Sequence, residues 1–166
     1  MHEPQPPADG PPAAHDAASL AAAAHRLEIA GETLLLLPDR AVAWPARRTL
    51  VVADLHFGKD DVFRRAGLAI PEGAVEEDLA RLSQLRAATR GESLLVLGAF
   101  EHGAVRAADG APPRFARWRE RHRGIAITVV AGNHDRHLRG DAASPPLEVE
   151  WHAGALQEGP FAFVHD

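Results

Sequence analysis

The sequence predicts an α/β fold with a largely parallel β-sheet, and three observations point to it. Short apolar runs of strand length recur along the chain, and several are bounded by Gly or Pro. Two longer segments with helical periodicity separate successive runs in the middle of the chain. Strands that alternate with helices are joined by crossover connections, which place neighbouring strands parallel.

The expected strands share a length of four to six residues and a mostly apolar character. They are Thr33–Leu37, Thr49–Ala53, Ser93–Leu97, Ile125–Val130, Leu147–Trp151 and Phe161–Val164. Before them, residues 1–25 are rich in Pro and Ala, so we expect a disordered tail there, of which residues 1–15 are dispensable. The length of 166 residues suits one domain, which we place at 26–166.

The first expected helix spans Glu72–Thr89. Its apolar side chains repeat at helical spacing on one face: Val75, Leu79, Leu82 and Leu85. Carboxylates fill its first turns, where they favour the positive end of the helix dipole.

The second expected helix spans Pro113–Arg123 and is rich in arginine. Phe115, Trp118 and His122 share one face, and we expect Trp118, like Trp44, to be a core residue. The arginines of this helix are Arg114, Arg117, Arg119, Arg121 and Arg123. They either meet a phosphate backbone or form a solvated face, and such runs are more often a solvated face.

Charge and composition exclude several classes of function. The formal net charge is −5, and three of these charges lie in the tail, so the rest of the chain is close to neutral and lacks a global electrostatic footprint for duplex DNA. A nucleic-acid substrate is not excluded by this, but its contact would have to be local or metal-mediated. The absence of cysteine excludes disulfides, zinc–thiolate sites and cysteine nucleophiles. Neither a membrane span nor an export signal is evident, so we expect a soluble, cytoplasmic protein.

Polar residues follow four of the expected strands. They are Asp54-Leu55-His56, Gly98-Ala99-Phe100-Glu101-His102, Gly132-Asn133-His134-Asp135 and His165-Asp166. In open α/β sheets functional side chains gather beyond the carboxyl ends of the strands. We therefore expect these residues to converge in one crevice.

Carboxylate, imidazole and amide ligands together suit divalent ions such as manganese, iron or zinc. Asp54 and His56 would reach one ion because alternate residues of an extended strand point the same way. Gly132 permits the sharp turn that aims Asn133 and His134 into the crevice. The segment 132–135 is a more specific indication of a functional site than Asp54-x-His56, since Asp-x-His triplets at strand ends are common.

With these motifs in this order, the sequence resembles the calcineurin-like metallophosphoesterases. It is most similar to one branch, the bacterial ligase-associated DNA damage response endonucleases (the PdeM group). The matching segments are LLLLPDRAVAWPARRTLVVADLHFGK at 34–59, FRRAGLAIPEG at 63–73, DLARL at 78–82, VVAGNHDR at 129–136 and GPFAFVHD at 159–166. The resemblance covers about Leu27 to Asp166.

The resemblance implies a sandwich of two β-sheets with helices outside. It implies two divalent ions, Mn²⁺ first among them, with Asp54 and His56 on the first ion, Asn133 and His165 on the second, and His134 as proton donor to the leaving oxygen. The implied activity is phosphodiester hydrolysis of DNA in repair, by the two-metal logic. The implied partners are DNA and a DNA ligase or helicase.

Two departures from the family pattern imply an impaired activity. The family's bridging Asp falls at Ala99, which has no ligand atom, and Glu101 is the nearest replacement. The family's later Gly-His-x-His is absent before the chain stops at Asp166, so we expect a C-terminally incomplete piece. Two other functions stay open: a small-molecule phosphoesterase, and a non-catalytic module that binds nucleic acid or a repair partner.

Overall fold

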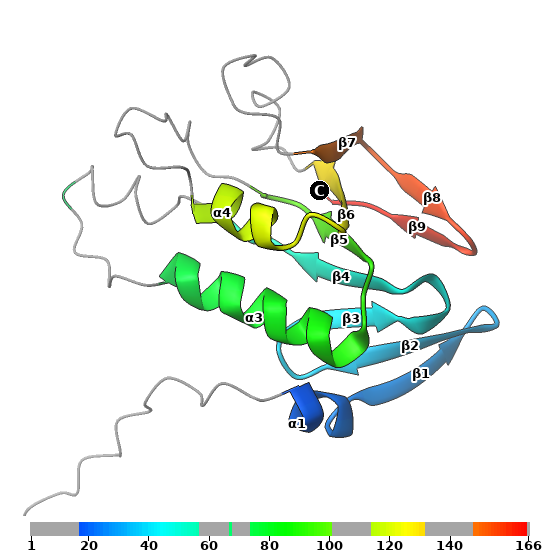
Figure 1. Cartoon of the computed structure of the whole chain (residues 1–166). Helices are drawn as coiled ribbons and strands as arrows, with labels where there is room; N and C mark the ends of the chain where they lie inside the picture. Colours follow the sequence, from blue (N-terminus) through cyan, green and yellow to red (C-terminus); the bar gives the residue numbers. More distant parts are fainter. Residues whose placement is uncertain (1–16, 57–66, 68–73, 101–113, 132–147, 166) are drawn as a thin grey trace, which may run out of the picture.

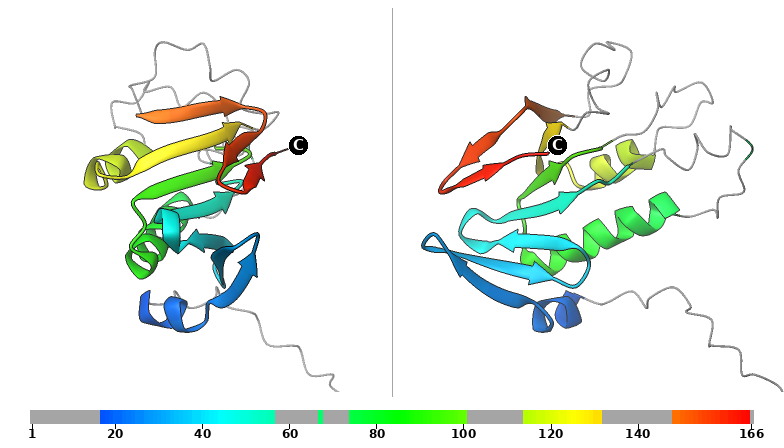
Figure 2. Two further views of the ribbon diagram at one scale, coloured as in Figure 1. Left: turned by 90° about the vertical axis from the view of Figure 1, so that its right-hand side faces the viewer. Right: turned by 180° about the vertical axis from the view of Figure 1, so that it is seen from behind.

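A computed structural model of the chain describes residues 17–56, 67, 74–100, 114–131 and 148–165. Within these residues, a seven-stranded sheet has helices on one face and a two-stranded hairpin on the other (Figure 1 and Figure 2). The strands of the large sheet are β1 (His25–Ile29), β2 (Glu32–Leu37), β3 (Ala41–Trp44), β4 (Thr49–Ala53), β5 (Ser93–Leu97), β6 (Ala126–Ala131) and β7 (Val149–Ala153). The hairpin consists of β8 (Leu156–Glu158) and β9 (Phe161–Phe163). In the described part of the chain, no helix is both long and apolar enough to cross a membrane.

The large sheet is mixed, with its strands in sequence order. Strands β1 to β4 pair antiparallel, and β4 to β7 pair parallel. The α/β class is therefore confirmed, but the expectation of a largely parallel sheet holds for only half of it. Short connections explain the antiparallel half, because a turn such as Ala30–Gly31, with φ of 52° and 80°, can join only antiparallel neighbours.

Three short strands were not expected from the sequence: β1, β3 and β8. Strand β1 has no buried residue and carries charge, so it lacks the apolar run that marks a strand. Polar pairing with β2 stabilises it, because the Thr33 hydroxyl donates to Glu28 Oε1 at 2.8 Å from the directly opposite position. That hydrogen bond, followed by one from Arg26, lowers the pKa of the Glu28 carboxyl.

Helices α3 (Ala74–Thr89) and α4 (Arg114–Arg121) cover the face of the parallel strands (Figure 1). The expected apolar face of α3 is confirmed, since its four predicted side chains are all buried. Trp44 and Trp118 are core residues, as predicted. The expected starts of both helices, at Glu72 and Pro113, lie outside the described residues, and α4 ends at Arg121 rather than Arg123.

The expectation of disorder throughout residues 1–25 is wrong for its last part. Helix α1 occupies Ala17–Ala22 and β1 begins at His25, while residues 1–16 lie outside the described part. Leu20 is fully buried in the main core cluster, and α1 packs against α3. One apolar side chain among alanines leaves little periodicity to read, which is why the sequence pattern missed it.

We expect Leu20→Ala to lower the free energy of unfolding by about 2–4 kcal/mol, because it leaves a cavity between α1 and α3. The exposed neighbour Ala21 provides the control, and Ala21→Ser should change stability by less than about 0.5 kcal/mol. Urea denaturation followed by circular dichroism measures both. Equal stability of the two variants would show that α1 does not dock.

The second face of the sheet is covered by the β8–β9 hairpin. Val51, Leu95 and Val130 form a separate buried cluster there, against which Leu156 and Phe163 pack. Figure 2 shows this layer on the side opposite the helices. The resemblance implies a sandwich of two β-sheets; among the described residues, the layer opposite the helices is this two-stranded sheet.

Candidate functional site at the carboxyl ends of the parallel strands

Strands β4, β5 and β6 end at the same edge of the sheet because they are parallel. Backbone hydrogen bonds continue past the strand ends and align the residues that follow. Asp54 N–H donates to the Leu97 carbonyl at 2.9 Å, and His56 N–H donates to the Ala99 carbonyl at 2.9 Å. The polar segment after β4 is therefore held directly beside the segment after β5.

Asp54 and His165 meet at this edge although they are far apart in sequence. The Asp54 carboxylate oxygen Oδ1 lies 3.2 Å from His165 Nε2. The same oxygen accepts a hydrogen bond from the Ala99 backbone N–H at 3.1 Å. The Asp54 side chain is 47% exposed and that of His165 25% exposed, so the pair is reachable from solvent.

Gly98 makes this approach possible. Its φ of +86° lies in the left-handed region, and a Cβ added there would lie 2.3 Å from the His165 ring and 2.4 Å from Asp54 Oδ1. Both distances are far below van der Waals contact. Sequence pattern assigned this glycine no role of its own, because the contact joins three segments that only the fold brings together.

The chain around Asp54 is locally strained. Asp54 and His56 both have positive φ values, 48° and 49°, which non-glycine residues seldom adopt. Leu55 between them is buried and anchors the segment in the core. The backbone is therefore not extended here, so the reason given for Asp54 and His56 reaching one ion is wrong, while their sharing an ion stays a prediction. Strain of this kind gathers at functional sites.

Two donor atoms of the kinds that bind divalent cations lie at this edge. A carboxylate oxygen and an imidazole nitrogen already converge, and His165 Nδ1 is buried with no hydrogen-bond partner among the described residues. Ala99 is buried beside Asp54 and offers only a methyl group. In the described part of the chain, no cluster of three or more His, Asp or Glu residues forms. The other predicted residues, Asn133, His134 and Glu101, lie outside the described residues.

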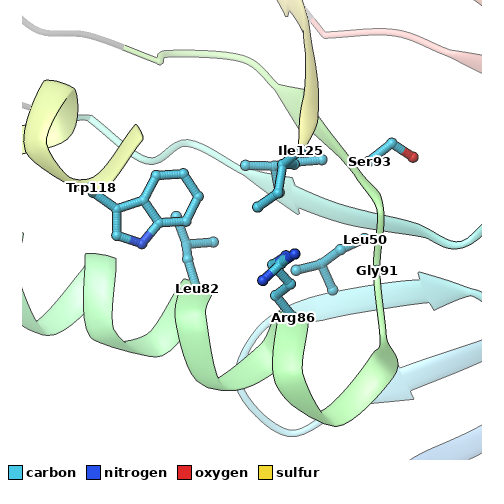
Figure 3. Close-up of a pocket in the computed structure, with 8 residues that line it drawn as sticks. Leu50, Leu82, Arg86, Gly91, Ser93, Trp118 and Ile125 are labelled. Carbon is cyan, nitrogen blue, oxygen red and sulfur yellow. The ribbon is translucent and has the colours of Figure 1, made fainter. Parts of the chain in front are cut away.

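A small cavity lies under the helices, away from this edge. Leu82 and Arg86 of α3, Trp118 of α4 and Leu50 of the sheet surround it (Figure 3). Its volume of about 10 Å³ admits at most one water molecule. Arg86 Nε is buried with no hydrogen-bond partner in the described part of the chain, and such a water would satisfy it. This cavity is too small to bind a substrate.

The fold and the site together define a mixed α/β protein with a carboxylate–imidazole pair at the carboxyl edge of its parallel strands. A comparison with solved structures finds the crystal structure of Pseudomonas putida nuclease MPE, with a TM-score of 0.70 and 35% sequence identity. The similarity covers 86% of this chain and 66% of the nuclease chain. The chain thus has the fold of that nuclease over most of its own length. No protein-family model and no curated protein matches the chain.

Proposed function

We propose that the chain is a metal-dependent nuclease that hydrolyses phosphodiester bonds in DNA. The observation that carries this proposal is the Asp54–His165 pair at the edge of the sheet, for which the absence of a side chain at Gly98 leaves room. The 35% identity to a nuclease of the same fold supports it. A role in DNA repair, with a ligase or helicase as partner, is proposed on the family resemblance alone.

In this proposal Asp54, His56, Asn133 and His165 hold divalent ions, with Mn²⁺ as the first candidate. Bound ions would stabilise the negative charge that develops on the phosphoryl group. The chain's own residues position the ligands: the Ala99 amide and the His165 ring both orient the Asp54 carboxylate. His134 would donate a proton to the leaving oxygen.

Ala99 favours a second candidate function, a nucleic-acid-binding module without turnover. Its methyl group lies at the position where the resemblance implies a bridging carboxylate, and it contributes no ligand. An ion held without that bridge binds more weakly and is less well positioned. We therefore propose slow hydrolysis for this chain, which Ala99→Asp alone should raise only a little.

We expect Asp54→Asn and His165→Gln each to weaken Mn²⁺ binding by at least about tenfold and to reduce hydrolysis further, because each removes a ligand. Calorimetric titration measures affinity, and cleavage of an end-labelled single-stranded oligonucleotide measures activity. Asp39→Asn and His152→Gln are matched controls of the same chemistry away from the site, where His152 pairs with Glu150. Circular dichroism verifies that all four variants fold.

Mn²⁺ binding that survives both site variants would refute the metal site. Metal binding that depends on Asp54 and His165, without DNA cleavage by the original chain or by Ala99→Asp, would refute the nuclease. The binding module would then be the better description if the chain still bound DNA.

A further inference from the structure

A cleft of about 330 Å³ lies between α3 and α4, on the helical layer rather than at the sheet edge. Figure 1 shows the two helices side by side over the sheet. Residues of both helices line it, among them Ser83 of α3 and Arg117, Trp118, Arg121 and His122 of α4 or the turn after it. The cleft therefore combines arginines with hydrogen-bonding side chains.

The arginines in and directly after α4 differ in what they contact. Arg119 is buried and donates to the His122 and Ile125 carbonyls at 2.9 and 2.7 Å, so it stabilises the turn into β6. Arg123 faces solvent and lies 4.0 Å from Glu120. Arg117 and Arg121 are different: they are exposed, one turn apart on the cleft, and have no acidic partner among the described residues.

A fixed set of polar atoms lies beside these two arginines. The Trp118 indole N–H donates to Ser83 Oγ at 2.8 Å, and His122 Nε2 lies 3.4 Å from the same oxygen. The His122 ring stacks on Trp118 with centroids 4.3 Å apart, and its Nδ1 lies 2.8 Å from the Trp118 carbonyl oxygen. Stacking and hydrogen bonds hold the ring in place, so the floor of the cleft is preorganised.

The charge of the cleft favours an anion. Two arginines and one carboxylate residue, Glu76, line the cleft. Arginine forks match phosphate oxygens and bind them through paired hydrogen bonds. Because the chain outside the tail is nearly neutral, any attraction for nucleic acid has to be local. These two arginines supply a local positive site.

We propose that the α3–α4 cleft binds the phosphodiester backbone of the DNA strand, with Arg117 and Arg121 as the phosphate contacts. This inference rests on the proposed nuclease function and names a contact away from the cutting site. Glu76, at the cleft, lies in the first turn of α3, and this helix begins near the edge of the sheet where β4 ends.

The test measures binding of a fluorescein-labelled single-stranded oligonucleotide by anisotropy, in EDTA and over a series of salt concentrations. The double variant R117Q/R121Q should bind about tenfold or more weakly, and its log–log salt slope should be smaller by about 1.4, since each phosphate contact on a single strand contributes about 0.7. R90Q/R123Q removes two exposed charges elsewhere and should leave the slope unchanged. Compared with R117Q/R121Q, the variant R117K/R121K should recover most of the salt slope and part of the affinity for the oligonucleotide.

An equal loss of oligonucleotide affinity in R117Q/R121Q and R90Q/R123Q would overturn the inference, because binding would then depend on total charge only. Full displacement of the oligonucleotide by millimolar inorganic phosphate would also overturn it, since the cleft would then bind free phosphate rather than a strand. EDTA separates this test from the proposed function. Strand binding lost only in R117Q/R121Q, in a chain that never cleaves DNA, would uphold the cleft and refute the nuclease.

Discussion

Replacing Gly98 with alanine is expected to destabilise the protein by about 2–4 kcal/mol and to separate Asp54 from His165. The left-handed conformation alone costs an alanine about 1–2 kcal/mol. The new Cβ would also overlap the His165 ring and the Asp54 carboxylate, at 2.3 and 2.4 Å. Relief requires one of these side chains to move, so Mn²⁺ affinity should fall together with stability.

Gly154→Ala separates the two causes. Gly154 has nearly the same φ, +84°, but an added Cβ there meets nothing within 4 Å. We expect this control to lose only the conformational part, about 1–2 kcal/mol, and to keep Mn²⁺ binding unchanged. Urea denaturation and calorimetric titration of both variants provide the measurement. If Gly98→Ala lost no more than Gly154→Ala in either quantity, the close approach of Asp54 and His165 would be wrong.

Trp118→Ala should be the most destabilising change in the helical layer, by about 3–5 kcal/mol. Trp118 is 2% exposed and is stacked between Phe115 and His122, with ring centroids 5.6 and 4.3 Å away. Its removal would leave a cavity where α3, α4 and the sheet meet (Figure 3). It would also free the His122 ring, so strand binding in the cleft should weaken at the same time.

A milder series isolates the hydrogen bond from the packing. Trp118→Phe keeps a ring but loses the indole N–H that donates to Ser83, and Ser83→Ala removes the acceptor. We expect a coupling free energy of about 1 kcal/mol from the double-mutant cycle, measured by urea denaturation. A coupling near zero would show that the indole and the hydroxyl do not interact, and the preorganised floor of the cleft would lose its basis.

Local sequence pattern predicted the regular elements well where one face of an element is buried. The spacing of Val75, Leu79 and Leu82 identified the buried face of α3, and the runs at β4 and β5 matched their strands to the residue. The pattern failed where an element has no buried face, or where one apolar residue makes its packing contact. Strand β1 is exposed throughout, and Leu20 is a single anchor in an alanine-rich helix.

The sequence by itself determined the α/β class, the core faces of the helices and the presence of polar residues at strand ends, because these depend on periodicity within one segment. It also determined that position 99 is alanine, whose side chain has no ligand atom whatever the fold. Only the tertiary structure decided which strand-end residues meet. The 3.2 Å approach of Asp54 to His165 needs a glycine from a third segment. Likewise, only the contacts of each side chain distinguish the exposed Arg117 and Arg121 from Arg119, which is buried and stabilises the turn into β6. Such long-range contacts leave no periodic trace in the chain, so the site and the cleft emerge only when the elements are packed together.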